Sequence, residues 1–195
     1  MRQKIRKNMP KIAVALLIVS ALLSISTMSS VERSLFTALY ELTNPFSQLF
    51  LILTQLGTIA MWFVSVAVAF AAKLRRLSWQ LLIGGGLSIF ATAVLKLAVG
   101  RPRPFDLFEA VSSSEVLVHG SGYPSGHTAL VTVMGLMLLP YVPKQFRWII
   151  VAVITAVGLS RIALGVHAPL DLVGGFAIGY LAVLIVKRVY PDSKK

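Results

Sequence analysis

The sequence lacks cysteine entirely and is poor in charged residues. Without cysteine the chain has no disulfide bond, no thiolate nucleophile and no cysteine-ligated metal site. Charged residues make up only 13% of the 195 residues, well below the usual quarter of a soluble domain. Hydrophobic residues reach 56%, and the mean hydropathy is +0.81. These values indicate an integral membrane protein rather than one or two soluble domains.

Acidic residues are especially scarce: 7 Asp and Glu stand against 19 Lys and Arg, which gives a formal net charge of +12. A charge of this size can indicate a nucleic-acid-binding protein. In this chain, however, the basic residues flank apolar runs instead of forming one patch, which is typical of the cytoplasmic side of a membrane protein. We therefore expect the bilayer as a partner and no nucleic acid, and the sequence indicates no particular oligomeric state.

Six apolar segments approach or exceed the length of about 20 residues that a helix needs to cross a bilayer. They cover residues 11–29, 47–72, 77–99, 124–142, 147–166 and 168–187. The apolar runs are continuous rather than alternating, which predicts helices and not barrel strands. Residues 1–195 are therefore expected to form one all-α domain, an integral membrane bundle of six transmembrane helices.

The first segment also resembles a signal peptide, because it follows a basic N-terminus. Its apolar run from Ile12 to Met28 is 17 residues long, and its Ser-rich end offers no clean Ala-x-Ala cleavage site. This length favours an uncleaved first membrane helix.

Basic residues in the loops predict the orientation of the bundle. With a cytoplasmic N-terminus, 14 of the 19 basic residues fall on the cytoplasmic side, and six of the seven acidic residues fall on the outer side. The outer basic residues are Arg33, Lys96, Arg101, Arg103 and Arg161. We therefore expect a multi-pass protein of the cell membrane with both termini in the cytoplasm.

Two outer segments are not expected to cross the membrane. Residues 30–44 have apolar side chains at helical spacing, and Ser29 with Glu32 could form a capping box at the start. This pattern predicts a short helix in the outer interface. Residues 105–123, which include His119, are expected to form a loop near the membrane, and the sequence leaves open whether that loop gates a site or only connects helices.

Three polar stretches interrupt the apolar chain: residues 96–104, 124–128 and 160–171. They lie at the end of the third segment, at the start of the fourth, and at the turn from the fifth to the sixth. Because successive helices alternate in direction, all three stretches are expected at the outer face. Charge placed inside a membrane segment is costly, so it predicts a functional site. Cations gathered there, against the positive-inside trend, predict an anionic ligand.

Lys96, Arg103 and Arg161 are the candidate anion-binding cations. The two prolines of the Arg-Pro-Arg-Pro run disfavour helix before them, so the third helix should stop near Gly100 and let Arg103 turn back toward Lys96. Arginine offers a planar fork that suits phosphate, and lysine offers a point charge. Snorkelling to lipid headgroups is an equally good interpretation of Lys96 alone. Headgroup contact is also what we expect for Arg101.

The second stretch reads Pro124-Ser-Gly-His127 and opens the fourth helix. Pro124 suits the first helical position, and the N–H groups of the following residues would then point at a ligand from the positive end of the helix dipole. Gly126 would let the ligand approach the backbone, and His127 could give or take a proton.

The third stretch contains His167 just before an Ala-Pro start of the sixth helix, with Asp171 four residues further on. A carboxylate in the first helical turn can reach back to residues just before the helix. Asp171 can therefore accept a hydrogen bond from one ring nitrogen of His167, which makes the other nitrogen a better nucleophile. A simple helix cap is the alternative interpretation of Asp171.

Three cations, two histidines and a helix start provide what phosphoryl transfer needs, namely positioning and charge stabilisation. One histidine can attack phosphorus while the other protonates the leaving oxygen. The three stretches contain no carboxylate cluster for a metal, so we expect no metal and no cofactor.

These stretches resemble the signature of the type 2 phosphatidic acid phosphatase (PAP2) family, in its bacterial membrane lipid phosphatase branch. The signature is Lys, six residues, Arg-Pro; Pro-Ser-Gly-His; and Ser-Arg, five residues, His, three residues, Asp. The matching residues are Lys96, Arg103-Pro104, Pro124-Ser125-Gly126-His127, Ser160-Arg161, His167 and Asp171.

The resemblance implies a catalytic role for three of these residues: His167 as the nucleophile that forms a phosphohistidine, Asp171 as the group that orients it, and His127 as the general acid. It also implies five phosphate-binding residues: Lys96, Arg103, Ser125, Gly126 and Arg161. The expected substrate is a lipid phosphate or pyrophosphate in the outer leaflet, of the undecaprenyl pyrophosphate, phosphatidylglycerophosphate or phosphatidic acid class.

Two other functions remain as alternatives. An intramembrane serine hydrolase would use Ser125 with a histidine, but the surrounding residues do not form a Gly-x-Ser-x-Gly elbow. A non-catalytic anion transporter would place its site at broken helices near the membrane centre, whereas these motifs cluster at one face.

Overall fold

The structure, a computed structural model, describes residues 2–25, 28–113 and 120–191. These residues form helices and connecting turns without strands, as the all-α prediction requires. The helices are α1 (Arg2–Ser24), α2 (Ser30–Thr43), α3 (Ser47–Thr54), α4 (Ile59–Ala71), α5 (Arg75–Val99), α6 (Pro104–Leu107), α7 (Gly126–Leu138), α8 (Arg147–Ala163) and α9 (Pro169–Val189). Short 3₁₀ turns connect several of them.

Five of the six expected segments correspond to single helices, namely α1, α5, α7, α8 and α9. The second segment is instead divided into α3 and α4, which belong to a pair of helical stretches bent by 50°. The division lies at Gly57 and Thr58: Thr58 leaves the helical conformation and caps α4 by accepting a hydrogen bond from the Met61 N–H at 3.2 Å. The prediction of one uninterrupted second helix is therefore wrong.

By length and apolar composition, three helices of the described chain are able to cross a bilayer, and a fourth is added if the bent pair counts as one span. These three comprise residues 75–107, 144–163 and 169–189. The apolar parts of α1 and α7 are shorter than 18 residues. The chain is thus a membrane-type helical bundle, although helix length alone does not establish six spans.

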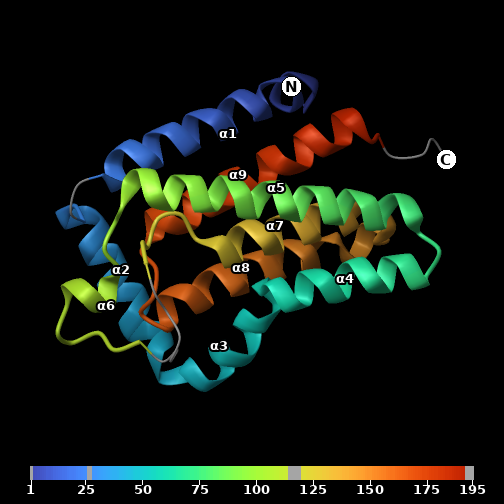
Figure 1. Cartoon of the computed structure of the whole chain (residues 1–195). Coiled ribbons are helices and arrows are strands. Elements are labelled where there is room, and N and C mark those ends of the chain that lie inside the picture. The colour runs from blue at the N-terminus through green and yellow to red at the C-terminus, as the bar shows by residue number, and fades with distance from the viewer. Residues whose placement is uncertain (1, 26–27, 114–119, 192–195) are drawn as a thin grey trace.

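Helix α7 lies at the centre of the bundle and contacts α4, α5, α8 and α9 (Figure 1). Close approach of α9 depends on small residues. A Cβ atom at Gly175 would lie 2.4 Å from the Ser125 carbonyl oxygen, and one at Gly179 would lie 2.5 Å from that of Ala129. The start of α7 is therefore pressed directly against the first turns of α9.

The bundle has two different ends (Figure 1). Helix α1 begins and α9 ends at one end. At the other end α5 ends, α7 begins, and the chain turns from α8 to α9, with α2, α3 and α6 beside them. The three polar stretches therefore meet at one end of the bundle, as the alternation of helix direction predicts. The short helix expected at 30–44 is present as α2 and packs against α8 and α9.

Candidate active site

The end of α5 and the turn into α6 supply the first two cations. Gly100 ends the helix in the left-handed conformation, with φ of 63°, at the position that the prolines predict. Lys96 lies in the last helical turn and donates its Nζ to the carbonyl oxygen of Ser121. Arg103 is buried and donates from Nε to the Gly120 carbonyl at 2.8 Å and from Nη1 to the Val166 carbonyl at 3.1 Å. Arg103 thereby joins the first polar stretch to the residue preceding His167.

The start of α7 differs from the prediction. The N-cap is Ser125, a favoured residue for that position, so the first helical residue is Gly126, two positions after Pro124. The Ser125 hydroxyl accepts a hydrogen bond from the Thr128 N–H at 3.4 Å. The Ser125 N–H donates to the Asp171 carbonyl at 2.9 Å, so this amide does not point at a ligand.

Gly126 occupies the first turn of α7, where backbone N–H groups have no partner within the helix. Packing does not require glycine at this position. A Cβ atom there would meet only the Thr92 methyl group, at an ordinary 3.7 Å. The absent side chain instead keeps space open in a pocket that Gly126 lines.

The turn between α8 and α9 supplies the remaining groups. Arg161, buried in the last turn of α8, donates from Nη1 to the Thr54 hydroxyl at 2.6 Å. Pro169 occupies the first position of α9, as predicted. Asp171 is fully buried, and its Oδ2 accepts from the Ala168 N–H at 2.8 Å and lies 3.3 Å from Nδ1 of His167. The expected contact between this carboxylate and His167 is thus present, and Asp171 also caps the helix.

Arg101 contacts carboxylates rather than lipid headgroups, so the headgroup interpretation of this residue is wrong. Its side chain is buried, with Nη1 2.9 Å from Asp171 Oδ1 and Nη2 2.5 Å from Glu32 Oε2. Nη1 also donates to the Ser24 hydroxyl at 3.2 Å. Two buried carboxylates give a guanidinium a far better environment than a lipid surface would, since its planar fork binds both.

The polar stretches converge at His167, whose N–H donates to the Arg161 carbonyl at 3.1 Å and whose preceding carbonyl, that of Val166, binds Arg103. Burial lowers the pKa of His167 well below its ordinary value, and the positive charges of Arg161, Arg103, Lys96 and His127 lower it further. Such an imidazole is neutral near pH 7, the form in which a ring nitrogen carries a lone pair. Among the described residues, no group of three or more His, Asp or Glu side chains lies close enough together to hold a metal ion.

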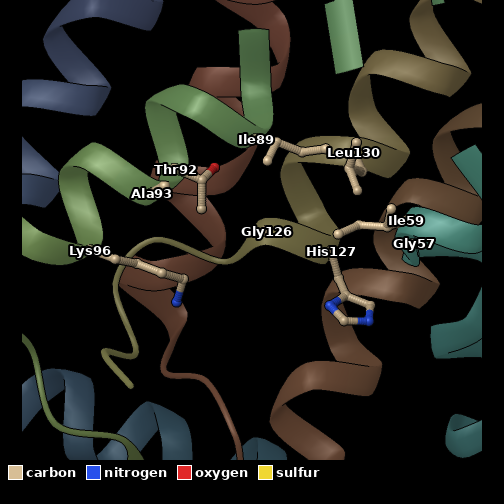
Figure 2. Close-up of a pocket in the computed structure, with 9 residues that line it drawn as sticks. All are labelled: Gly57, Ile59, Ile89, Thr92, Ala93, Lys96, Gly126, His127 and Leu130. Carbon is tan, nitrogen blue, oxygen red and sulfur yellow. The ribbon is translucent and has the colours of Figure 1, made fainter. Parts of the chain in front are cut away.

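A pocket of about 260 Å³ lies beside these groups. Its polar side chains include Lys96 and His127, and much of the remaining wall is apolar, with Ile59, Ile89 and Leu130. Figure 2 shows the Lys96 ammonium and the His127 ring extending from α5 and α7 toward the same space, with Gly126 between them. A ligand in this pocket would therefore meet an anion-binding end and an apolar wall.

Sequence reasoning missed the contribution of the first three helices. Ser24, Glu32 and Thr54 are buried polar residues that bind Arg101 or Arg161. Their only signal in the sequence is a polar group within an otherwise apolar or amphipathic segment. The predicted capping box at Ser29 forms only in part, because the Glu32 N–H bonds to the Ser29 hydroxyl while the Glu32 carboxylate binds Arg101. His119 and the rest of 114–119 lie outside the described residues.

Relatives named after lipid phosphate chemistry share part of this sequence. The undecaprenyl-diphosphatase of Sulfolobus acidocaldarius is 30% identical over 134 residues, which are 67% of this chain and 64% of that protein. Phosphatidylglycerophosphatase B of Bacillus subtilis is 33% identical over 127 residues, or 57% of this chain and 59% of that protein. The chain thus matches less than two thirds of the length of either relative.

The fold extends the similarity to almost the whole chain. The crystal structure of a transmembrane PAP2 type phosphatidylglycerolphosphate phosphatase from B. subtilis aligns with a TM-score of 0.72, covering 94% of this chain and 98% of that one at 22% identity. Residues 77–195, which hold all three polar stretches, match the sequence profile of the PAP2 superfamily. The chain therefore belongs to the PAP2 superfamily.

Proposed function

We propose that this protein is an integral membrane phosphatase that hydrolyses a phosphate from a lipid phosphate or pyrophosphate, without a metal, through a phosphohistidine. The observation that carries the proposal is a buried His167 that lies beside Arg161 and the carbonyl bound by Arg103, near a largely apolar pocket that Lys96 and His127 line. A phosphate ester carries a charge of about −1.5 to −2 near neutral pH, which these cations can balance. The apolar wall suits the lipid part of the substrate.

In the first step, Nε2 of His167 attacks phosphorus. Asp171 lies at Nδ1, which leaves Nε2 with the lone pair. The bond from phosphorus to the leaving oxygen breaks, its electron pair goes to that oxygen, and protonated His127 supplies a proton. The products of this step are the protonated leaving group and phosphohistidine.

In the second step, water attacks the phosphohistidine. Neutral His127 accepts a proton from the water as the oxygen bonds to phosphorus. The phosphorus–nitrogen bond breaks and returns its electron pair to His167. Inorganic phosphate leaves, and His127 is again protonated.

Five residues are proposed to bind the phosphate oxygens during both steps: Lys96, Arg103, Arg161, Ser125 and the amide of Gly126. The cations stabilise charge that develops on the equatorial oxygens. Gly126 contributes an N–H at the positive end of α7. The Ser125 hydroxyl, which also caps α7, can donate its proton to a phosphate oxygen while accepting from the Thr128 N–H.

The proposed substrates follow from the pocket and from the relatives. One relative is named for undecaprenyl diphosphate and another for phosphatidylglycerophosphate. Phosphatidic acid presents the same combination of apolar chains and a terminal phosphate. A panel of these three lipids would distinguish monophosphate from diphosphate preference.

We further propose that residues 1–195 act as one domain whose six helices cross the membrane, with both termini in the cytoplasm and the site at the outer face. The positive-inside distribution of Lys and Arg supports this orientation. Because the chain lacks cysteine, single cysteines can report it directly. An impermeant maleimide on intact cells should label Ser34→Cys and should not label Lys144→Cys until the cells are opened; the reverse pattern would contradict the orientation.

The function is tested by phosphate release from the three lipids, using purified protein in detergent with excess chelator. We expect release by the wild type and a loss of at least about 10³-fold in His167→Ala. Ser125→Ala should lower the rate without abolishing it, since it removes one of five phosphate contacts. No release, or equal release by His167→Ala, would contradict the proposal. Loss in Ser125→Ala with activity retained in His167→Ala would instead support a serine hydrolase.

A further inference from the structure

Arg101 and Glu32 lie outside the set of residues proposed to touch the phosphate. We propose that they are positioning residues, which hold Asp171 and, through it, the His167 ring in the orientation needed for attack on phosphorus. This inference rests on the function proposed above. It adds to the site an arginine that binds Oδ1 of Asp171, the oxygen not shared with His167, and a carboxylate that binds this arginine.

Both carboxylate oxygens of Asp171 are occupied by different parts of the site. Oδ2 binds the Ala168 N–H at 2.8 Å and lies 3.3 Å from the His167 ring. Oδ1 accepts from Arg101 Nη1 at 2.9 Å. A carboxylate with only the Oδ2 contacts could rotate about its terminal torsion, whereas a contact on each oxygen fixes the plane of the group. Arg101 therefore determines the direction in which Asp171 presents Oδ2 to His167.

Glu32 holds Arg101 and the start of α9 together. Its Oε2 lies 2.5 Å from Arg101 Nη2, and its Oε1 accepts from the Leu170 N–H at 3.1 Å. Leu170 lies between Pro169, the first residue of α9, and Asp171. The first-turn N–H groups of a helix lack partners within it, so Glu32 acts as a cap supplied by another helix. One carboxylate thus fixes both the arginine and the helical turn that carries Asp171.

Burial makes this arrangement sensitive to the loss of one charge. The side chains of Arg101, Glu32 and Asp171 are exposed by 1%, 5% and 0%. Removing one partner of a buried ion pair leaves an uncompensated charge, which costs more than the pair itself contributes. Without Arg101, two buried carboxylates would remain without the guanidinium that binds them both. Asp171 would then turn or recruit another donor, and the His167 ring would follow it.

The backbone of Gly122 links the Arg101 segment to the Oδ2 side of Asp171. A Cβ atom at Gly122 would lie 3.3 Å from Asp171 Oδ2 and 3.3 Å from the Pro102 carbonyl oxygen. The Gly122 N–H donates to the Arg101 carbonyl at 2.7 Å. The arginine that binds Asp171 is therefore anchored through its backbone as well as through Glu32.

The kinetic test compares Arg101→Gln, Arg101→Lys and Glu32→Gln in the full-length protein. Arg101→Gln should lower kcat roughly 10- to 100-fold, the range for a misplaced catalytic group, while KM changes by less than about twofold. Arg101→Lys keeps the charge but not the fork, so it should recover part of the lost kcat. Glu32→Gln should show the same pattern with a smaller loss of kcat. The matched control is Glu41→Gln, an exposed carboxylate of the same helix, which should match wild type.

A second measurement follows the His167 ring itself and needs no turnover. The chain has only three histidines, so histidine-selective isotope labelling gives a simple NMR spectrum, assigned with His167→Asn. The charged groups that act on His167 are Asp171 on α9, Arg161 on α8, Lys96 on α5, Arg103 at the start of α6 and His127 on α7. Arg101→Gln removes a positive charge from Asp171 and should move the His167 titration midpoint to higher pH. Arg101→Lys should leave that midpoint near the wild-type value.

The outcomes separate this inference from the proposed function. If the wild type releases no phosphate from any lipid, the proposed function fails, and the positioning of His167 is judged by its titration alone. If the wild type is active, unchanged kcat and an unchanged His167 midpoint in Arg101→Gln would overturn the inference. A rise in KM with unchanged kcat would overturn it as well, because Arg101 would then bind substrate. If Arg101→Gln does not fold, the same measurements of kcat, KM and the His167 midpoint are made on Arg101→Lys and Glu32→Gln.

Discussion

Arg101 and Arg103 are separated by a single proline, yet their side chains bind different groups. Arg101 binds two buried carboxylates, Glu32 and Asp171. Arg103 donates to the carbonyl oxygens of Gly120 and Val166. A carboxylate cancels the charge of the cation it binds, whereas a carbonyl oxygen orients a cation without cancelling a full charge. Neighbouring arginines in one polar stretch therefore bind different kinds of group.

The same contrast extends to the other cations of the site. Lys96 donates to the Ser121 carbonyl, and Arg161 donates to the Thr54 hydroxyl. Like Arg103, each is held by at least one neutral oxygen, and each lowers the pKa of His167. In the proposed function Lys96, Arg103 and Arg161 bind the phosphate, whereas Arg101 binds carboxylates of the protein itself.

Neutralising one of the cations proposed to bind the phosphate should cause the largest loss of kcat/KM. Arg103→Gln and Arg161→Gln are each expected to lower kcat/KM about 10³-fold, because each removes charge stabilisation from the transferring phosphate. Initial rates of phosphate release over a range of lipid concentrations measure the loss. The comparison fails if Arg101→Gln proves as damaging as these variants, or if either of them retains wild-type kcat/KM.

Adding a methyl group at Gly126, which lines the pocket, should weaken substrate binding without disturbing the fold. Gly126→Ala would meet only Thr92, at 3.7 Å, yet it would narrow the pocket next to Lys96 and His127. We expect KM to rise about tenfold, the cost of displacing a ligand that approaches the backbone closely. Gly86→Ala is the matched control, since a Cβ atom there has no neighbour within 4 Å. Equal KM values for the two variants would show that Gly126 does not face the ligand.

Removal of the Thr54 hydroxyl, which binds Arg161, should have a moderate effect on kcat/KM. Thr54→Val removes the 2.6 Å hydrogen bond to Arg161 while keeping the shape of the side chain. A guanidinium with more freedom should lower kcat/KM roughly three- to tenfold, in line with the loss of one hydrogen bond to a charged group. Thr43→Val, which removes a buried hydroxyl bonded within its own helix to Leu39, serves as control. Equal kcat/KM values in the two valine variants would exclude a role for Thr54 in holding Arg161.

Mild acid should have the smallest effect, a small change in the kcat/KM of the wild type. In the proposed mechanism neutral His167 is the attacking form, and burial with nearby positive charges lowers its pKa well below the ordinary value. Activity due to this group is therefore retained as the pH falls through the ordinary histidine range and is lost only at the lowered pKa. Arg103→Gln removes one of those charges, so its acid limb of kcat/KM should lie at higher pH on the same substrate. An acid limb at the same pH in both proteins would contradict the electrostatic account of His167.

Local parts of the site could be predicted from the sequence because short-range rules determine them. Prolines after Gly100 end α5, and Pro169 begins α9. The contact of Asp171 with His167 follows from a carboxylate in the first turn reaching back. Ser125 shows the limit of this reasoning, since the sequence contained both a proline suited to N1 and a better N-cap residue after it. The serine determined where the helix begins.

Contacts between distant segments could not be predicted. Arg101 and Glu32 are 69 positions apart, and no periodicity links them. The division of the second apolar segment has the same origin. A Cβ atom at Gly57 would lie 3.0 Å from the His127 Cβ and 2.8 Å from a Val157 methyl group. The chain at Gly57 lies this close to α7 and α8 because of the tertiary packing, which the sequence pattern does not reveal.

Binding of inorganic phosphate, the reaction product, tests the division between the two arginines most directly. Its inhibition constant can be measured for the wild type, Arg103→Gln and Arg101→Gln under identical conditions. If Arg103 binds phosphate and Arg101 positions Asp171, the constant should rise about tenfold or more in Arg103→Gln and stay within about twofold of wild type in Arg101→Gln. An equal rise in both variants, or a rise in Arg101→Gln alone, would contradict this account.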